Sequence, residues 1–231
     1  MRTRIKKFGF EIEGEFSREF SGEIAKYGVM KGDGSVSNCP ERCQHLVTGE
    51  YNSYPILRTH KREAKNIFMK FQDAYKLKKY HFNKSAGFHI HVSFSPKLPP
   101  DIFSKSFNDF FHERLKTKYP NVIKKRQNNI YCRINTLEDG ALDKLPRYSS
   151  INFQQAWLKH GTIEFRVFPA NTPMMMYRYL LFTLRVINDF LKKENIHYAL
   201  DVNMEKIIDT PRVRNIVAET SLKENEVIII N

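Results

Sequence analysis

Three short segments of the chain each carry two polar side chains separated by one apolar residue. Side chains at positions i and i+2 of a β-strand point to the same face of a sheet. Because the intervening residue is apolar in every case, the opposite face of each strand would be buried in a core. We therefore expect one open sheet face that carries all three pairs: Glu11 with Glu13, His89 with His91, and Glu164 with Arg166.

These residue types indicate phosphoryl chemistry assisted by a divalent cation. Carboxylates on one face repel one another unless a cation lies among them. Carboxylate oxygens together with an imidazole nitrogen suit Mg²⁺ or Mn²⁺, and Mg²⁺ completes its coordination with water and substrate phosphate oxygens. Arg166, beside Glu164, would then bind a phosphate or stabilise a phosphoryl group during its transfer.

Period-two alternation of apolar and polar residues predicts strands around the three pairs, and two shorter strands elsewhere. In the third of these alternating segments, the pattern places Phe168 on the open face beside Arg166. Half-polar strands suit an antiparallel sheet that is covered by helices on one face and open on the other. The predicted strands cover residues 7–16, 46–51, 86–94, 149–154 and 162–168.

Helical spacing of apolar residues predicts helices over residues 59–77, 101–119 and 172–193, which would cover the apolar face of the sheet. The third begins at Thr172-Pro173, a capping threonine followed by proline at the first helical position. A second such start at Thr210-Pro211 extends this helical C-terminal part to about residue 220. The sequence therefore predicts an α+β fold in a single domain.

The region of residues 120–146 follows neither period, and we interpret it as a long loop over the site. In a separate segment, Cys39, Cys43 and His45 lie close together in the sequence and could bind zinc. Structural zinc takes four ligands, and the sequence offers no clear fourth ligand near these three residues. A loop with free thiols is therefore the favoured interpretation of the cluster.

Length and composition predict one folded domain, residues 1–231, and the cysteine count favours the cytoplasm. The chain has a mass of 27.3 kDa and 41% apolar residues, which is enough for a core and excludes a fully disordered chain. No apolar run approaches the length of about 18 residues that a transmembrane helix needs, so we expect no membrane association. The basic N-terminus leads into charged residues, unlike a signal peptide, and an odd number of cysteines makes a poor disulfide framework.

The excess of basic residues predicts an acidic partner. Lys and Arg number 38 against 25 Asp and Glu, which gives a net charge of +13. The basic residues concentrate in residues 58–84 and 112–133. We interpret these segments as a basic rim that attracts a phosphate-bearing ligand to the site, and a solvated helix face is the alternative.

Six segments resemble, in order, motifs of the carboxylate–amine ligase superfamily that contains glutamine synthetase and glutamate–cysteine ligase. The chain most resembles the amidoligase branch, a compact group of bacteria and phages. It departs from the pattern in lacking a Trp shortly before the second motif, since its single Trp is Trp157. The motifs lie within residues 8–168: Gly-x-Glu-x-Glu at 9–13, Asp-x-Ser at 33–35, Glu-x-x-Ser-x-Pro at 50–55, Gly-x-His-x-His-Val at 87–92, Arg-Tyr…Asn at 147–152, and Thr-x-Glu-x-Arg at 162–166.

The resemblance implies a curved antiparallel sheet that binds ATP and two Mg²⁺ ions on its concave face, with helices on the outer face. It implies an ATP-dependent ligase that joins a carboxylate to an amine through an acyl phosphate, with a peptide or protein as one candidate substrate. Arg166 would stabilise the transferring phosphoryl group, Arg147 would be a second anion contact, and Asp33 would bind or orient the amine. His91 would contact nucleotide or substrate. The implied metal ligands are Glu11, Glu13, Glu50, His89 and Glu164.

Two other functions remain open at this level. The net charge of +13 also fits a nucleic-acid-binding module that uses the open sheet face, although the glutamates on that face would repel a phosphate backbone. A metal-dependent phosphohydrolase could use the same carboxylates to activate water. A ligase whose acceptor is a nucleic acid would account for both the candidate site and the positive net charge.

Overall fold

The structure is a computed structural model, and its description covers most of the first 193 residues. The C-terminal residues expected to form a second helix start lie outside this part, as do Arg147 and the Cys39, Cys43 and His45 cluster. The described residues are 4–33, 46–83, 85–95, 102, 104–126, 129, 132, 134, 148–153 and 161–193.

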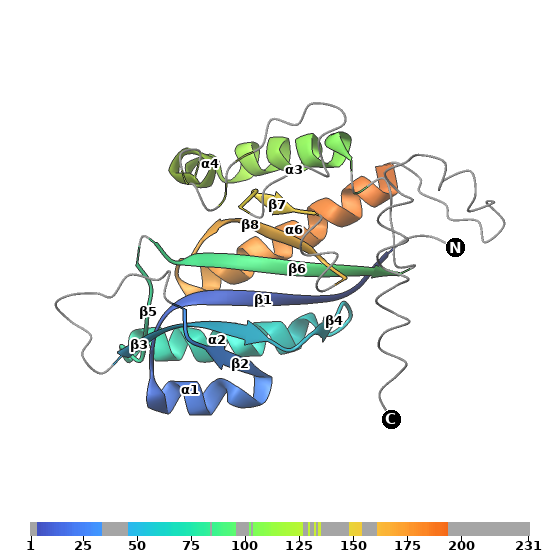
Figure 1. The fold of residues 1–231 in the computed structure, drawn as a ribbon. Helices are drawn as coiled ribbons and strands as arrows, with labels where there is room; N and C mark the ends of the chain where they lie inside the picture. The colour runs from blue at the N-terminus through green and yellow to red at the C-terminus, as the bar shows by residue number, and fades with distance from the viewer. Residues whose placement is uncertain are drawn as a thin grey trace, which may run out of the picture.

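One eight-stranded sheet forms the centre of the molecule, with strands ordered β2-β3-β1-β6-β8-β7 (Figure 1). Strands β4 and β5 pair with β1 outside this order. All described pairings are antiparallel, which confirms the predicted α+β class with a mainly antiparallel sheet. The strands are β1 (Arg4–Ser17), β2 (Gly28–Lys31), β3 (Leu46–Ser53), β4 (Ile56–Leu57), β5 (Tyr80–His81), β6 (Gly87–Ser95), β7 (Ile151–Asn152) and β8 (Ile163–Pro169).

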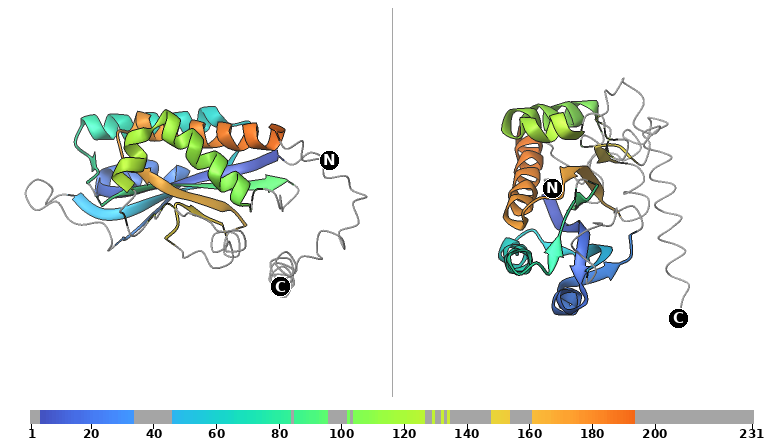
Figure 2. Two further views of the ribbon diagram at one scale, coloured as in Figure 1. Left: turned by 90° about the horizontal axis from the view of Figure 1, so that it is seen from above. Right: turned by 90° about the vertical axis from the view of Figure 1, so that its left-hand side faces the viewer.

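Three long helices cover one face of this sheet, as the sequence predicts. In the two views of Figure 2, α2, α3 and α6 form a layer on the same side of the strands. None of the described helices is both long enough and apolar enough to cross a membrane. The helices are α1 (Arg18–Ile24), the 3₁₀ turn η1 (Ala25–Tyr27), α2 (Lys61–Lys76), α3 (Lys105–Lys118), α4 (Pro120–Arg126) and α6 (Pro173–Lys193).

Local signals in the sequence account for where two of the helices begin. Helix α3 begins after Ser104, whose side-chain oxygen accepts a hydrogen bond from the backbone N–H of Phe107. Such a cap satisfies one of the amide donors that the first turn of a helix leaves without a partner. Helix α6 begins at Pro173, directly after Thr172, as predicted. The described part of this helix extends to Lys193.

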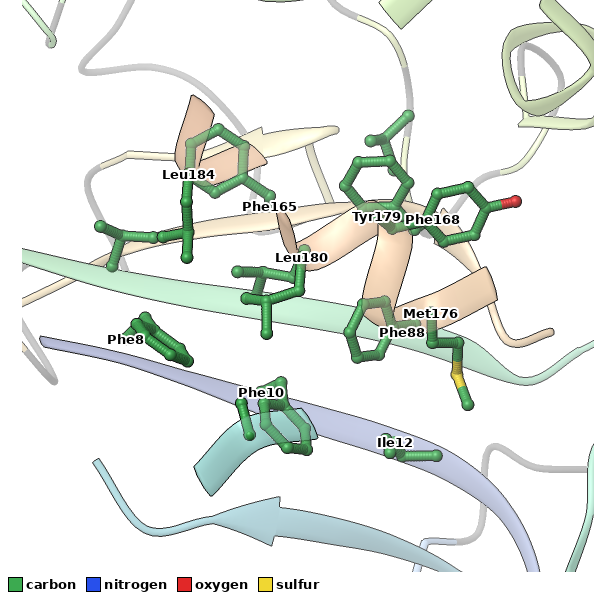
Figure 3. Close-up of a cluster of buried hydrophobic side chains, with 14 of the residues drawn as sticks. Phe8, Phe10, Ile12, Phe88, Phe165, Phe168, Met176, Tyr179, Leu180 and Leu184 are labelled. Atoms are coloured by element: carbon green, nitrogen blue, oxygen red, sulfur yellow. The ribbon is translucent and has the colours of Figure 1, made fainter. Parts of the chain in front are cut away.

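The core lies between the sheet and the helical layer, and aromatic rings fill much of it. Figure 3 shows side chains of β1, β6 and β8 facing those of α6. The rings of Phe10 on β1 and Phe68 on α2 stack with centroids 4.6 Å apart. Phe107 of α3 meets Phe165 of β8 edge to face. Because full burial of one such side chain contributes roughly 1.5–3 kcal/mol, this interface fixes which face of the sheet is covered.

A bulge in β8 overturns the predicted position of Phe168. The pairing of β6 with β8 shifts between Phe88, which pairs with Phe168, and Ile90, which pairs with Phe165. Two residues of β8 therefore oppose one residue of β6, and the alternation changes phase beyond the bulge. Phe168 is fully buried and stacks on Tyr179 of α6 with centroids 4.7 Å apart, so it belongs to the core.

Two other expectations need correction. The region interpreted as a long loop begins with a helix, α4, in which Arg126 is buried and donates hydrogen bonds to the carbonyls of Ala86 and Phe168. The basic segments were expected at the rim of the site. Instead α2 and α3, which carry much of them, pack on the apolar face of the sheet, opposite the polar pairs.

Candidate functional site

The strand register brings the three polar pairs together on the face of the sheet that the long helices leave open. Glu11 of β1 lies opposite His89 of β6. On the other side of β6, His91 lies opposite Glu164 of β8. On the other side of β1, Glu13 lies opposite Glu50 of β3. Four neighbouring strands therefore contribute acidic or imidazole groups to one surface.

Glu11 lies between the two histidines. Its Oε2 is 3.0 Å from Nδ1 of His89, and its Oε1 is 3.0 Å from Nε2 of His91. Burial alone would raise the pKa of Glu11, but the hydrogen bonds and charges of both imidazoles hold it well below its usual range. The other ring nitrogen of His91, Nδ1, is 3.1 Å from the hydroxyl of Thr162, which orients the ring.

His89 is buried among three carboxylates. Besides Glu11, its ring lies 3.6 Å from an oxygen of Glu13 and 3.5 Å from an oxygen of Glu164. Burial lowers the pKa of an imidazole, but the hydrogen bond to Glu11 and the two neighbouring glutamates outweigh burial and raise the pKa of His89.

Glu164 is fixed by two donors. Its Oε2 accepts a hydrogen bond of 2.8 Å from the amide of Asn152 on β7, and its Oε1 pairs with the guanidinium of Arg166. Burial raises the pKa of Glu164, whereas the charges of His89 and Arg166 lower it, and the net shift is downward. The guanidinium carbon of Arg166 also lies 5.8 Å from the ring centroid of Tyr148.

A second cluster of acidic residues lies toward β3 and the end of β2. The backbone N–H of Gly87 donates to Glu13, and the amide of Asn52 donates to Glu50. Burial and the charge of Glu11 raise the pKa of Glu50. Asp33 follows β2, and because Lys31 of that strand pairs with Glu50, the register carries Asp33 toward the same two glutamates.

Within the described residues, the ligand atoms form two groups of three, and in each group the atoms lie within 4.8 Å of one another. Oxygen-rich donor sets with at most one imidazole fit Mg²⁺ or Mn²⁺ better than softer metals. Three protein ligands also leave coordination positions for water and phosphate oxygens. The first group is Glu11, His91 and Glu164, and the second is Glu13, Asp33 and Glu50.

A pocket of about 440 Å³ adjoins the first group. Glu11 and His91 line it, and so do two basic residues, Lys7 and Lys31. Its volume lies within the range of about 300–1,000 Å³ that is typical of small-molecule sites. Gly9 also lines the pocket, and its lack of a side chain leaves space beside the hydroxyl of Ser53.

Gly87 gives His89 the space that it occupies. A Cβ atom at position 87 would lie 2.8 Å from Nε2 of His89 and 3.1 Å from Oε2 of Glu13. Both contacts are shorter than normal van der Waals separations, so any side chain here would displace the imidazole or the carboxylate. This requirement explains why a glycine begins β6 at this position.

The structure brings together every predicted site residue that it describes, with two differences in arrangement. The residues implied as metal ligands did not include His91 or Asp33, yet each of these offers an atom to one of the two groups. His89, which was implied as a metal ligand, belongs to neither group. Three further residues were not predicted from the sequence: Asn52, which bonds Glu50, and the two lysines of the pocket. Arg147 lies outside the described residues, whereas its neighbour Tyr148 lies close to Arg166.

The chain matches none of the protein-family models, and none of the curated proteins is similar enough to count as a match.

Proposed function

We propose that the protein is a metal-dependent enzyme of phosphoryl transfer. More particularly, we propose that it is an ATP-dependent ligase that forms an amide from a carboxylate and an amine. One observation carries the proposal. Two adjacent groups of three ligand atoms lie on one sheet face, with Arg166 bonded to a member of the first group. Paired cation sites beside a guanidinium suit the transfer of a phosphoryl group.

In this proposal, Glu11, His91 and Glu164 hold one divalent cation, and Glu13, Asp33 and Glu50 hold a second. When bound, such ions neutralise phosphate oxygens and align the transferring group. His89 then acts as a positioning residue, because its hydrogen bond to Glu11 fixes one carboxylate while its ring lies near Glu13 and Glu164. Asn52 positions Glu50 in the same way.

Arg166 supplies the fixed positive charge of the proposed mechanism. Its bond to Glu164 holds the guanidinium beside the first cation group, where it would donate to oxygens of the transferring phosphoryl group. A substrate carboxylate oxygen attacks the γ-phosphorus of ATP, the bond to the bridging oxygen breaks, and ADP leaves. An amine then attacks the acyl-phosphate carbonyl carbon, inorganic phosphate leaves, and the nitrogen loses a proton to solvent.

The experiment is an assay of ADP and phosphate with Mg²⁺ and ATP, against a panel of amino acids and short acidic peptides paired with amines. The proposal expects ADP formation that depends on both a carboxylate and an amine, with an amide product detected by mass spectrometry. Folded, Mg²⁺-loaded protein that forms no ADP across the panel would contradict it. The control variant is Asp189→Asn, a change on α6 in the helical layer. It shows whether a variant preparation is intact without a change in the candidate site.

A metal-dependent phosphohydrolase is the second candidate, because two cation groups of this kind also suit attack by water. The same assay separates the two functions. Phosphate release that requires neither carboxylate nor amine identifies a hydrolase, whereas release that requires both identifies a ligase.

A further inference from the structure

The helical side of the molecule carries much of the positive charge, on the opposite side of the sheet from the candidate site. The net charge of the whole chain is +13. Helices α2, α3, α4 and α6 each carry more Lys and Arg than Asp and Glu. The candidate site, by contrast, gathers glutamates on the other face. The basic residues of these helices therefore do not serve as the rim of that site.

Helices α3, α4 and α6 meet around Tyr119, and each carries exposed basic residues close in sequence to this contact. The ring of Tyr119 meets Tyr179 and Phe182 of α6 edge to face, with centroids 5.1 and 5.3 Å away. Burial raises the pKa of Tyr119, and the charges of Arg178 and Arg185 oppose this effect, so both arginines lie near its hydroxyl. Six exposed residues make up what we call the α3–α6 basic surface: Lys116, Lys118, Lys124, Lys125, Arg178 and Arg185.

None of the carboxylates in the described part of the chain forms an ion pair with the α3–α6 basic surface. Across the described part of the chain, the ion pairs formed by Lys and Arg involve Lys79, Lys105 and Arg166, and none involves the α3–α6 basic surface. Lys79, for example, pairs with Glu19 at 2.8 Å. Unpaired charges of one sign repel one another, and a polyanion bound to them relieves that repulsion and releases its own counterions.

The composition of the surface distinguishes between two kinds of polyanion. Helices that bind anionic membranes insert apolar side chains between lipids. Among the described residues, none of the large exposed apolar side chains lies on α3, α4 or α6. These exposed apolar side chains lie on other elements, for example Met69 on α2 and Val47 on β3. A hydrophilic polyanion therefore fits this surface better than a lipid bilayer does.

We propose that the α3–α6 basic surface binds the phosphate backbone of a nucleic acid. The contacts are Lys and Arg to phosphate, which position a protein on nucleic acid without reading its sequence. Because the surface lies opposite the metal groups, this binding needs neither ATP nor Mg²⁺ coordination by the glutamates. It is thus a second function that is independent of the proposed ligase activity.

The test is fluorescence anisotropy of the full chain with a labelled DNA duplex and a labelled single-stranded RNA, from about 50 mM to about 200 mM NaCl. We expect the logarithm of the affinity to fall linearly with the logarithm of salt concentration. The double variant Arg178→Glu/Arg185→Glu should bind at least about tenfold more weakly and reduce the slope by about 2. Arg178→Lys/Arg185→Lys should keep most of the affinity, because the charge remains.

The matched control is Arg18→Glu/Lys26→Glu, which makes the same change in net charge at exposed positions of α1 and η1. It should change the affinity by less than about threefold, since it leaves the phosphate contacts intact. Equal losses in the two charge-reversal variants would overturn the proposal, because the effect would then come from net charge alone. No binding at low salt, or tighter binding to phosphatidylserine vesicles than to nucleic acid, would overturn it as well.

Far-UV circular dichroism and thermal unfolding confirm that each variant is folded. If the arginine variant does not fold, Lys124→Glu/Lys125→Glu on α4 provides a second test, with the same expected loss of affinity and the same control. Full affinity in a folded Lys124→Glu/Lys125→Glu variant would contradict the assignment of α4 to the surface.

Discussion

Glu11 and His89 lie opposite each other on adjacent strands, with Oε2 of the carboxylate 3.0 Å from Nδ1 of the imidazole. The same glutamate bonds His91 through its other oxygen. One carboxylate thus connects both histidines of β6, and its position determines the geometry of the first cation group. The consequences of this arrangement can be tested by substitution.

Replacing Glu11 by Gln should weaken Mg²⁺ binding and reduce ADP formation by at least about 100-fold, the scale expected when a buried charged contact to a transferring group is lost. The amide keeps the size of the side chain but removes its negative charge. Calorimetric titration with Mg²⁺ and the ADP assay measure the two effects. Glu113→Gln on α3, an exposed glutamate outside the site, is the matched control and should resemble the wild type. Wild-type turnover in Glu11→Gln would refute the assignment.

Replacing Gly87 by Ala should impair the site more than the fold. The added Cβ would meet the ends of two side chains, His89 and Glu13, which can rotate away and thereby leave their places in the site. Gly14→Ala is the contrast, because its Cβ would lie 2.6 Å from the backbone oxygen of His81, which cannot rotate away. We expect a clear loss of thermal stability in Gly14→Ala and a smaller loss in Gly87→Ala. Gly87→Ala with normal Mg²⁺ affinity would count against the site geometry.

Sequence periodicity predicts the main strands and helices because each is long and has one apolar face. The alternation in residues 7–16 and 86–94 is borne out by the burial of Phe10 and Ile90 on the core side. Short elements such as β4 and β5 have two residues each, too few to show a period. Their positions depend on pairing with β1, which is a tertiary contact.

The same limit applies to the site. Four of the six candidate ligands lie on strands with clear alternation, and the phase of that alternation alone predicts that they share one face: Glu11, Glu13, His91 and Glu164. Asp33 is different, since it reaches Glu13 only through the pairing of β2 with β3, and no local pattern reveals that register. Phe168 was misplaced for a related reason, because a bulge changes the phase of a strand without any marker in its composition.

Phe168→Ala should destabilise the protein by about 3–5 kcal/mol, the usual cost of truncating a buried phenylalanine. The ring is fully buried against Tyr179, so its loss leaves a cavity in the core. Urea unfolding measures the change in the free energy of unfolding. Thr162→Ala, a truncation of a partly exposed residue at the pocket, provides the comparison and should cost much less. A loss below about 1 kcal/mol for Phe168→Ala would place the ring outside the core.

His112 should make stability fall in mildly acidic solution. Burial lowers the pKa of this histidine below its usual 6.5, and its ring contacts the carbonyl of Asn108 and the hydroxyl of Ser150. A lowered folded-state pKa means that the unfolded chain binds the proton more readily, so this contribution is fully present above pH 6.5 and decreases as the pH falls below that value.

Urea unfolding between about pH 8 and pH 5 tests this effect. The difference in stability between the wild type and His112→Gln should shrink as the pH falls, because only the wild type carries the penalty of the buried imidazole. A constant difference over this range would show that His112 does not contribute in this way.

The number of divalent ions that the sheet face holds tests the central claim most directly. Titration with Mn²⁺, followed by electron paramagnetic resonance in the presence of a non-hydrolysable ATP analogue, counts bound ions without requiring a known substrate. The proposal predicts two ions per chain, one for each group of ligands, and one ion in either Glu164→Gln or Glu50→Gln. Folded wild-type protein that binds no Mn²⁺, or variants that still bind two ions, would contradict it.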